Sequence, residues 1–134
     1  MNIFDITGKK AIVTGGSVGL GHGMVEGLHE AGAEVVIIDI MDEAATVAKE
    51  LSKNGAKVHS VKANLADRQS LNSGFNEAID LLGGRLDILV NNAGIVKRHQ
   101  AEEFPIEDWD LVIEIDVIAV FQFCQLAGKF MLVQ

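Results

Sequence analysis

The sequence predicts an α/β fold in which helices flank a parallel β-sheet. Four short apolar runs alternate with segments of helical periodicity, which is the pattern of strands joined by crossover helices. The first run ends at a cluster of glycines, and the second run ends at a carboxylate. The predicted strands lie near residues 10–14, 34–39, 57–62 and 86–91.

Length and composition indicate one domain over residues 1–134, with an apolar content of 49% that suits a packed core. A net charge of −8 argues against a nucleic-acid partner, which needs a basic face. Cys124 is the single cysteine, so we expect a reducing cytoplasm and a core or interface thiol. The N-terminus lacks a signal-peptide pattern. The longest uncharged run of the second half, Val117 to Gly128, is shorter than the ~20 residues of a membrane span.

The first predicted strand leads directly into a helix through Thr14-Gly15-Gly16-Ser17-Val18-Gly19-Leu20-Gly21. Backbone N–H groups at such a helix start are unpaired, and the helix dipole adds positive charge, so phosphate groups bind there. The glycines do not follow the G-x-G-x-x-G spacing of the dinucleotide fingerprint. A tight turn that only packs the helix on the sheet therefore stays an alternative. The helix is expected from about Gly19 to Ala31, with Gly32 as its C-terminal glycine.

The second predicted strand, Glu34 to Asp39, ends in an acid about 20 residues beyond the glycines. A carboxylate at this place can accept hydrogen bonds from an adenosine ribose. It would also repel a 2′-phosphate, and no Arg or Lys follows within the next nine residues. The pattern predicts NAD as the cofactor in preference to NADP. The alternative for Asp39 is a solvated strand-end acid or the N-cap of the next helix.

Two further helices are predicted from apolar stripes, which are packing features. The second helix is expected to end at Asn54-Gly55, and the third to begin with Asp67 as N-cap and to end at Gly83-Gly84. The stripes consist of Ala44, Val47, Ala48 and Leu51 in the second helix and of Leu71, Phe75, Ala78, Ile79 and Leu82 in the third.

The last segment, Pro105 to Gln134, begins with residues typical of a helix start and is then apolar on nearly every side. Such a helix is buried on both faces, which predicts one face on the sheet and the other on a partner subunit. A β-branched strand at 117–121 is the competing interpretation. Because no Gly, Pro or Asn interrupts the run there, a helix is favoured.

Two motifs together, Thr14-Gly-x-x-x-Gly19-x-Gly21 and Asn91-Asn92-Ala93-Gly94, resemble those of the short-chain dehydrogenase/reductase family over the whole chain. The resemblance implies a Rossmann-type sheet of order 3-2-1-4 and an NAD(P)-dependent oxidoreductase that is usually a tetramer. It implies that Asp39 holds the adenosine ribose. The other cofactor-binding residues it implies are Gly15, Ser17, Gly19, Leu20 and Gly21 at the pyrophosphate, Asn64 and Leu65 beside the adenine, and Asn92, Ala93 and Gly94 at the nicotinamide-side ribose.

Met1 to Asp5 and Asn91 to Arg98 are similar to the corresponding stretches of sugar-acid members of the family, such as gluconate 5-dehydrogenase and 2-deoxygluconate 3-dehydrogenase. By this resemblance Arg98 lies near the active-site mouth, where a guanidinium could pair with a substrate carboxylate. An ordinary solvated loop cation is the equal alternative. The expected partner is thus a small-molecule substrate, and no metal site is expected.

The family's catalysis uses a Ser and a Tyr-x-x-x-Lys pair, and this chain contains no tyrosine. We therefore expect the first half of a dehydrogenase, inactive by itself. Asp116 aligns with a fourth catalytic residue, an Asn, but a carboxylate cannot donate as an amide does, and a purely structural bond is the alternative. A fourth strand without its neighbour would present an open edge. Homo-oligomerisation through this edge or the last helix is therefore expected.

Two other functions remain open from the sequence. One is a stand-alone nucleotide-binding or interaction module without catalytic activity. The other is a flavodoxin-like receiver, which would need an acidic cluster at the end of the first strand, where this chain has Thr14-Gly15.

Overall fold

The computed structural model describes residues 2–52 and 56–134, and it contains the predicted parallel sheet. The strand order is β3-β2-β1-β4, and all three pairings are parallel. The predicted fold class and strand order are therefore confirmed. The strands are β1 (Lys10–Thr14), β2 (Glu34–Asp39), β3 (Val58–Lys62) and β4 (Ile88–Val90).

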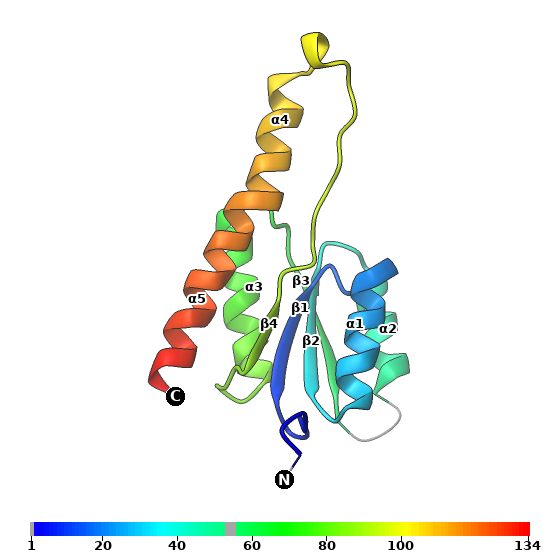
Figure 1. Cartoon of the computed structure of the whole chain (residues 1–134), viewed down its shortest axis with the longest axis vertical. Coiled ribbons are helices and arrows are strands. Elements are labelled where there is room, and N and C mark those ends of the chain that lie inside the picture. The colour runs from blue at the N-terminus through cyan, green and yellow to red at the C-terminus, as the bar shows by residue number, and fades with distance from the viewer. Residues whose placement is uncertain (1, 53–55) are drawn as a thin grey trace.

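Helices cover both faces of the sheet (Figure 1). Helices α1 (Gly19–Glu30) and α2 (Glu43–Leu51) lie on one face, and α3 (Arg68–Leu81) and α5 (Ala119–Val133) lie on the other. Because successive strand residues point to opposite faces, the core divides into two apolar clusters. On β2, Val35 and Ile37 belong to the α1/α2 cluster, whereas Val36 and Ile38 belong to the α3/α5 cluster.

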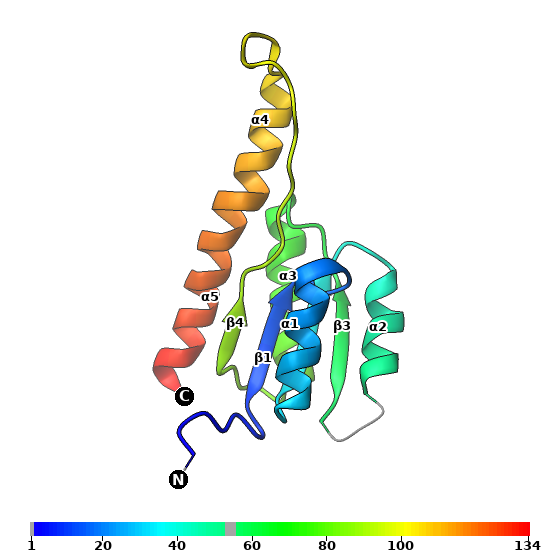
Figure 2. The same ribbon diagram turned by 45° about the vertical axis from the view of Figure 1, so that its right-hand side comes forward.

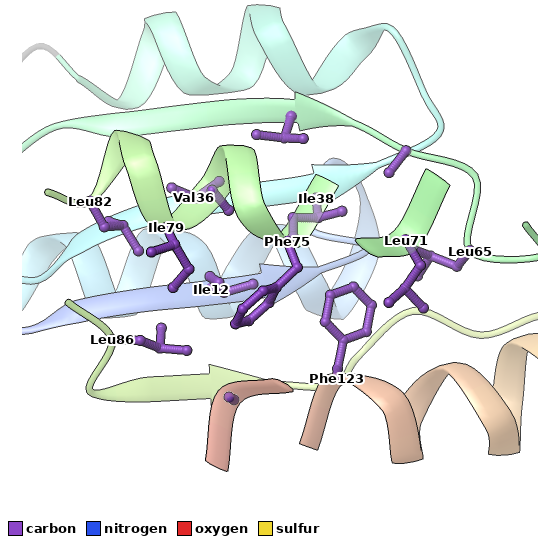
Figure 3. Packing of buried hydrophobic residues seen from close by; sticks show 14 of the residues in the cluster. Ile12, Val36, Ile38, Leu65, Leu71, Phe75, Ile79, Leu82, Leu86 and Phe123 are labelled. Carbon is purple, nitrogen blue, oxygen red and sulfur yellow. The ribbon is translucent and has the colours of Figure 1, made fainter. Parts of the chain in front are cut away.

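The α3/α5 cluster contains the largest buried side chains (Figure 3). Phe75 of α3 and Phe123 of α5 are each 1% exposed, and their ring centroids lie 6.4 Å apart. Ile12 from β1 lies beside them. Burial of two aromatic side chains between helix and sheet, each typically stabilising by about 2–3 kcal/mol, fixes α3 and α5 on this face.

Helix ends follow the sequence signals. The Asp67 carboxylate accepts hydrogen bonds from Gln69 N at 2.9 Å and from Ser70 N at 3.2 Å, which caps α3 as predicted. Gly32 has φ +96° beyond α1, and Gly83 and Gly84 have φ +76° and +85° beyond α3. These left-handed conformations favour glycine. The predicted stop of α2 at Asn54-Gly55 lies outside the described residues.

The last segment is a helix, as expected, and no strand forms at 117–121. It runs continuously over Ile106–Val133 as α4 (Ile106–Ile113), a π-helical segment (Glu114–Ile118) and α5. Helix α4 and the loop that follows β4, which contains a 3₁₀ turn over Ala101–Glu103, project together beyond the sheet (Figure 2). We call residues 91–118 the projecting arm.

The α5 part of this long helix has one buried side and one exposed side. Ala119, Phe123 and Ala127 are buried against the core, whereas Val117 and Phe121 are exposed on the other side. Cys124 is also exposed on the outward side of α5, so it is not a core thiol, and its expected place in an interface stays a prediction. By length and composition alone, the helix Ile106–Val133 could cross a membrane.

Candidate cofactor site

The turn between β1 and α1 is built on two left-handed glycines. Gly15 has φ +66° and Gly19 has φ +61°, values that L-residues with a side chain seldom adopt. The Gly15 N–H donates to the carbonyl oxygen of Ile38 at 2.8 Å, which ties the turn to the end of β2. The chain thereby reverses within a few residues and starts α1 at the carboxyl edge of the sheet.

Two of the motif glycines are required by packing inside the protein. A Cβ on Gly21 would collide with the carbonyl oxygen of Gly15 and with the side-chain amide of Asn92. A Cβ on Gly15 would lie 2.9 Å from the Cα of Ala93. These glycines let the turn, α1 and the loop after β4 approach one another, so the tight-turn interpretation accounts for part of the motif.

The amino end of α1 remains open to an anion. Its N-cap residue, Val18, is extended and supplies no side-chain hydrogen bond, and no acid lies in the first turn. The hydroxyl oxygen of Ser17 is buried and has no hydrogen-bond partner among the residues that the structure describes. Uncapped amides and an orphaned hydroxyl suit the oxygens of a diphosphate. The residues present here therefore fit a dinucleotide.

Asp39 is held at the tip of β2 by backbone hydrogen bonds. Its Oδ2 accepts from Ser17 N at 3.2 Å and its Oδ1 from Met41 N at 3.2 Å. The residue is only 9% exposed. An ionised carboxylate has about four acceptor sites, so two amide donors leave capacity for the hydroxyl groups of a ribose. The alternative of a freely solvated acid does not fit this geometry.

The loop after β4 is fastened to β1 by three hydrogen bonds. Thr14 Oγ1 accepts from Asn92 N at 3.1 Å and from Ala93 N at 3.0 Å. The side chain of Asn92 donates from Nδ2 to the carbonyl oxygen of Gly15 at 3.0 Å. The two resemblance motifs thus meet in space, and their contact shapes one wall of the site.

Asp116 lies in the π-helical segment and supports the same loop. Its Oδ1 accepts from Ile95 N at 2.9 Å, and a Cβ on Gly94 would lie 3.2 Å from that oxygen. The π-helical segment is also tied to α3, because Arg68 Nε donates to Glu114 Oε1 at 2.7 Å. This guanidinium holds the pKa of Glu114 below its usual value, although partial burial opposes the shift. A structural bond of Asp116 is observed, and its catalytic role remains a prediction.

These elements surround a cleft of about 690 Å³ at the carboxyl edge of the sheet. Such an edge is the usual ligand site of open α/β sheets. The cleft brings together most of the predicted cofactor residues. Those that line it are Gly15, Asp39, Asn64, Leu65, Asn92, Ala93 and Gly94.

Four predicted cofactor residues do not line the cleft, namely Ser17, Gly19, Leu20 and Gly21. Ser17 is buried beside Asp39, and Gly21 is enclosed by the turn. Leu20 is 80% exposed at the start of α1. Their contact with a pyrophosphate stays a prediction, because backbone amides and not side chains would make it.

On the substrate side of the site, the role expected of Arg98 stays a prediction. Arg98 is exposed on the projecting arm and lines neither the cleft nor a second cavity of about 440 Å³ beside it. Lys97, its neighbour, lines both. Within the described ranges, no group of three or more His, Cys, Asp or Glu side chains could hold a metal ion.

Sequence reasoning did not identify several residues of the cleft wall. Ile40 and Met41 follow Asp39 directly, and their position after the end of a strand could have predicted that they line the cleft. Leu111 and Ile115 come from α4 and the π-helical segment. Their contribution depends on how the projecting arm folds over the sheet, for which the local sequence carries no signal.

A parallel sheet of this order, with a glycine turn at a helix start and an acid at the tip of β2, defines a Rossmann-like, nucleotide-binding class of protein. Residues 9–134 match the short chain dehydrogenase family. The chain therefore belongs to this family.

Three relatives illustrate the likeness. Over 134 residues the chain is 36% identical to a 2-dehydro-3-deoxy-D-gluconate 5-dehydrogenase of Escherichia coli, with all of this chain and 52% of the relative covered. It is 34% identical to a 5-keto-D-gluconate 5-reductase of the same species, with 97% and 51% covered. Among solved structures, a blue fluorescent protein from a metagenomic library in complex with NADPH has a TM-score of 0.86 and 32% identity, with 93% and 52% covered.

The chain spans about half the length of the curated relatives it matches. The short chain dehydrogenases are oxidoreductases that bind a nicotinamide cofactor.

Proposed function

We propose that this chain is the cofactor-binding part of an NAD-dependent oxidoreductase that acts on a sugar acid or a similar alcohol or ketone. The observation that carries the proposal is Asp39, which lines the cleft and is oriented by the amides of Ser17 and Met41. A fixed carboxylate favours the two hydroxyl groups of an NAD ribose, and it disfavours a 2′-phosphate with its charge of about −2.

The bound nicotinamide would supply the hydride acceptor or donor. This chain's residues would bind and orient the cofactor. The open start of α1 would receive the diphosphate, and Asn92 to Gly94, fastened through Thr14, would contact the nicotinamide-side ribose. The positively charged stretch Lys97-Arg98 would meet the carboxylate of a sugar acid, with Lys97 on the cleft wall. The names of two relatives, both gluconate derivatives, support this substrate class.

The proposal includes a cytoplasmic, membrane-free protein that self-associates. Self-association is supported by the exposed apolar side of α5 and by β4, which pairs only with β1 among the described strands. A partner subunit would cover this surface.

Calorimetric titration of the 134-residue chain with NAD, NADP and ATP tests the cofactor assignment. We expect NAD to bind at least tenfold more tightly than NADP, which corresponds to about 1.4 kcal/mol. Asp39→Asn should lower the ratio of NAD affinity to NADP affinity. Asp80 is an exposed acid on α3, and Asp80→Asn should leave this ratio unchanged. Thermal melts of each variant control for folding, since an asparagine side chain has one acceptor oxygen and can accept only one of the two amide hydrogen bonds that Asp39 accepts.

A preference for NADP would contradict the assignment of NAD. Tight binding of ATP with none of either dinucleotide would favour the alternative of a nucleotide-binding module without catalytic activity.

A further inference from the structure

Lys62 lies beside Asp39, the carboxylate proposed to hold the adenosine ribose. The two residues are partners in the register of β2 and β3, and neighbouring strands lie only about 4.8 Å apart. Their side chains also leave the sheet on the same face. Asp39 follows Val35 and Ile37 in alternation, Lys62 follows Val58, and these three apolar residues all belong to the α1/α2 cluster.

The Lys62 ammonium pairs with Asp42 at the start of α2. Its Nζ donates to Asp42 Oδ1 at 2.7 Å. The hydrogen bond and the positive charge of Lys62 hold the pKa of the Asp42 carboxyl below its usual value. Asp39 is instead occupied by two backbone amides. The ammonium is therefore held by Asp42, although its strand position places it next to Asp39.

The helix does not need the Asp42 carboxylate for its own capping. Asp42 occupies the N-cap position of α2 but accepts no capping hydrogen bond. Its side chain is 84% exposed, and that of Lys62 is 65% exposed. An exposed ion pair of this kind contributes little to folding. The pair can consequently be altered without loss of the fold. A substitution in the pair then changes mainly the electrostatic charge around Asp39.

We propose that Asp42 helps to select the cofactor by holding Lys62 away from the position of a 2′-phosphate. This inference rests on the proposed function. With the pair formed, the acids Asp39 and Asp42 outweigh Lys62, and these three residues together carry one net negative charge. Without the Asp42 charge, the lysine is free to pair with a phosphate on the adenosine ribose. Asp42 is thus a positioning residue that acts through Lys62.

Binding of NAD and NADP to Asp42→Asn tests this inference. We expect a threefold to tenfold gain in NADP affinity and less than a twofold change in NAD affinity. The gain should shrink as the salt concentration rises, because exposed charges are screened. Glu43→Gln is the matched control. It removes the same charge one residue further along α2, where Glu43 forms no ion pair with any residue that the structure describes.

The double variant Asp42→Asn/Lys62→Gln separates release of the lysine from simple loss of an acid. We expect it to return the NADP affinity to that of the parent chain. The inference is overturned if the double variant keeps the gain, if Glu43→Gln produces an equal gain, or if Asp42→Asn leaves NADP binding unchanged while the parent binds NAD. A parent chain that binds neither dinucleotide would overturn the proposed function and this inference with it.

Discussion

Gly21 and Gly23 are two residues apart on α1, and a methyl group would meet different surroundings at each. At Gly21 it would collide with the Gly15 carbonyl and the Asn92 side chain, whereas at Gly23 no atom lies within 4 Å. We expect Gly21→Ala to lower the free energy of unfolding by about 1–3 kcal/mol through overpacking. It should also weaken NAD binding at least tenfold, because the turn and the loop after β4 move apart.

Gly23→Ala is the control, and it should stabilise α1 by about 0.5–1 kcal/mol because alanine favours the helix. Urea unfolding and calorimetry measure both effects. Equal stability and equal NAD affinity of the two variants would contradict the packing role of Gly21.

Single residues could be predicted from the sequence where one chemical property decides their role. Asp39 is such a residue, since a carboxylate after a buried strand and a glycine turn has few other uses. Lys97 and Arg98 were not distinguishable in this way. They are adjacent cations in a loop without periodicity, so the direction of each side chain depends on how the projecting arm packs.

Strands β1 and β4 are joined at their amino ends by Asp87. Its Oδ2 accepts from Lys10 N at 2.9 Å, and Arg85 Nε donates to its Oδ1 at 3.0 Å. The Arg85 hydrogen bond holds the pKa of the Asp87 carboxyl below the usual value of 3.8, and the Lys10 amide adds to this effect against partial burial. The ionised carboxylate therefore stabilises the folded state above pH 3.8, and this stabilisation is lost as the pH falls through the lower folded-state pKa.

We expect Asp87→Ala to cost about 1 kcal/mol at neutral pH, because the Lys10 amide loses its acceptor. For Asp87→Asn, the difference in the free energy of unfolding from the parent should be constant above about pH 5 and should shrink in more acidic solution. Urea titrations between roughly pH 2.5 and 7 would measure it, with Asp80→Asn as control. A difference that grew on acidification would contradict the assignment.

The secondary structure elements were predictable where apolar periodicity and end signals agree. Helix α3 has both an apolar stripe and the Asp67 cap, and its start is confirmed at Arg68. The π-helical segment over Glu114–Ile118 was not predictable. An apolar run reads the same in an α- or a π-helical turn, so the local sequence carries no signal for the π-helical segment.

At the scale of the whole molecule, α5 exposes the apolar side chains of Phe121, Leu132 and Val133. Phe121, near the start of α5, is 63% exposed. We expect the chain to associate with increasing concentration in sedimentation experiments, since water contact with such a surface is unfavourable. Phe121→Asp should favour the monomer and raise the dissociation constant of self-association at least tenfold.

Phe4→Asp is a control of the same chemistry, because Phe4 is 83% exposed near the N-terminus and far from α5 in the sequence. It should leave the association unchanged. A parent chain that stays monomeric at high micromolar concentration would remove the proposed self-association.

At this scale, the fold class and strand order followed from the alternation of strand and helix patterns, and the cleft followed from their carboxyl ends meeting at one edge. The projecting arm could not be predicted from the sequence. Its residues make few buried contacts, as α4 contains no buried residue, so no apolar pattern in the sequence marks how far it extends.

The π-helical segment Glu114–Ile118 lets the two ends of one long helix meet two different packing requirements, one at the cleft and one in the core. A wider turn shifts the angular phase of everything after it relative to everything before it. The phase of the first half can therefore suit Leu111 on the cleft wall, while the phase of the second half places Phe123 in the core. Site and core can in this way be adjusted separately, although a single unbroken helix carries both.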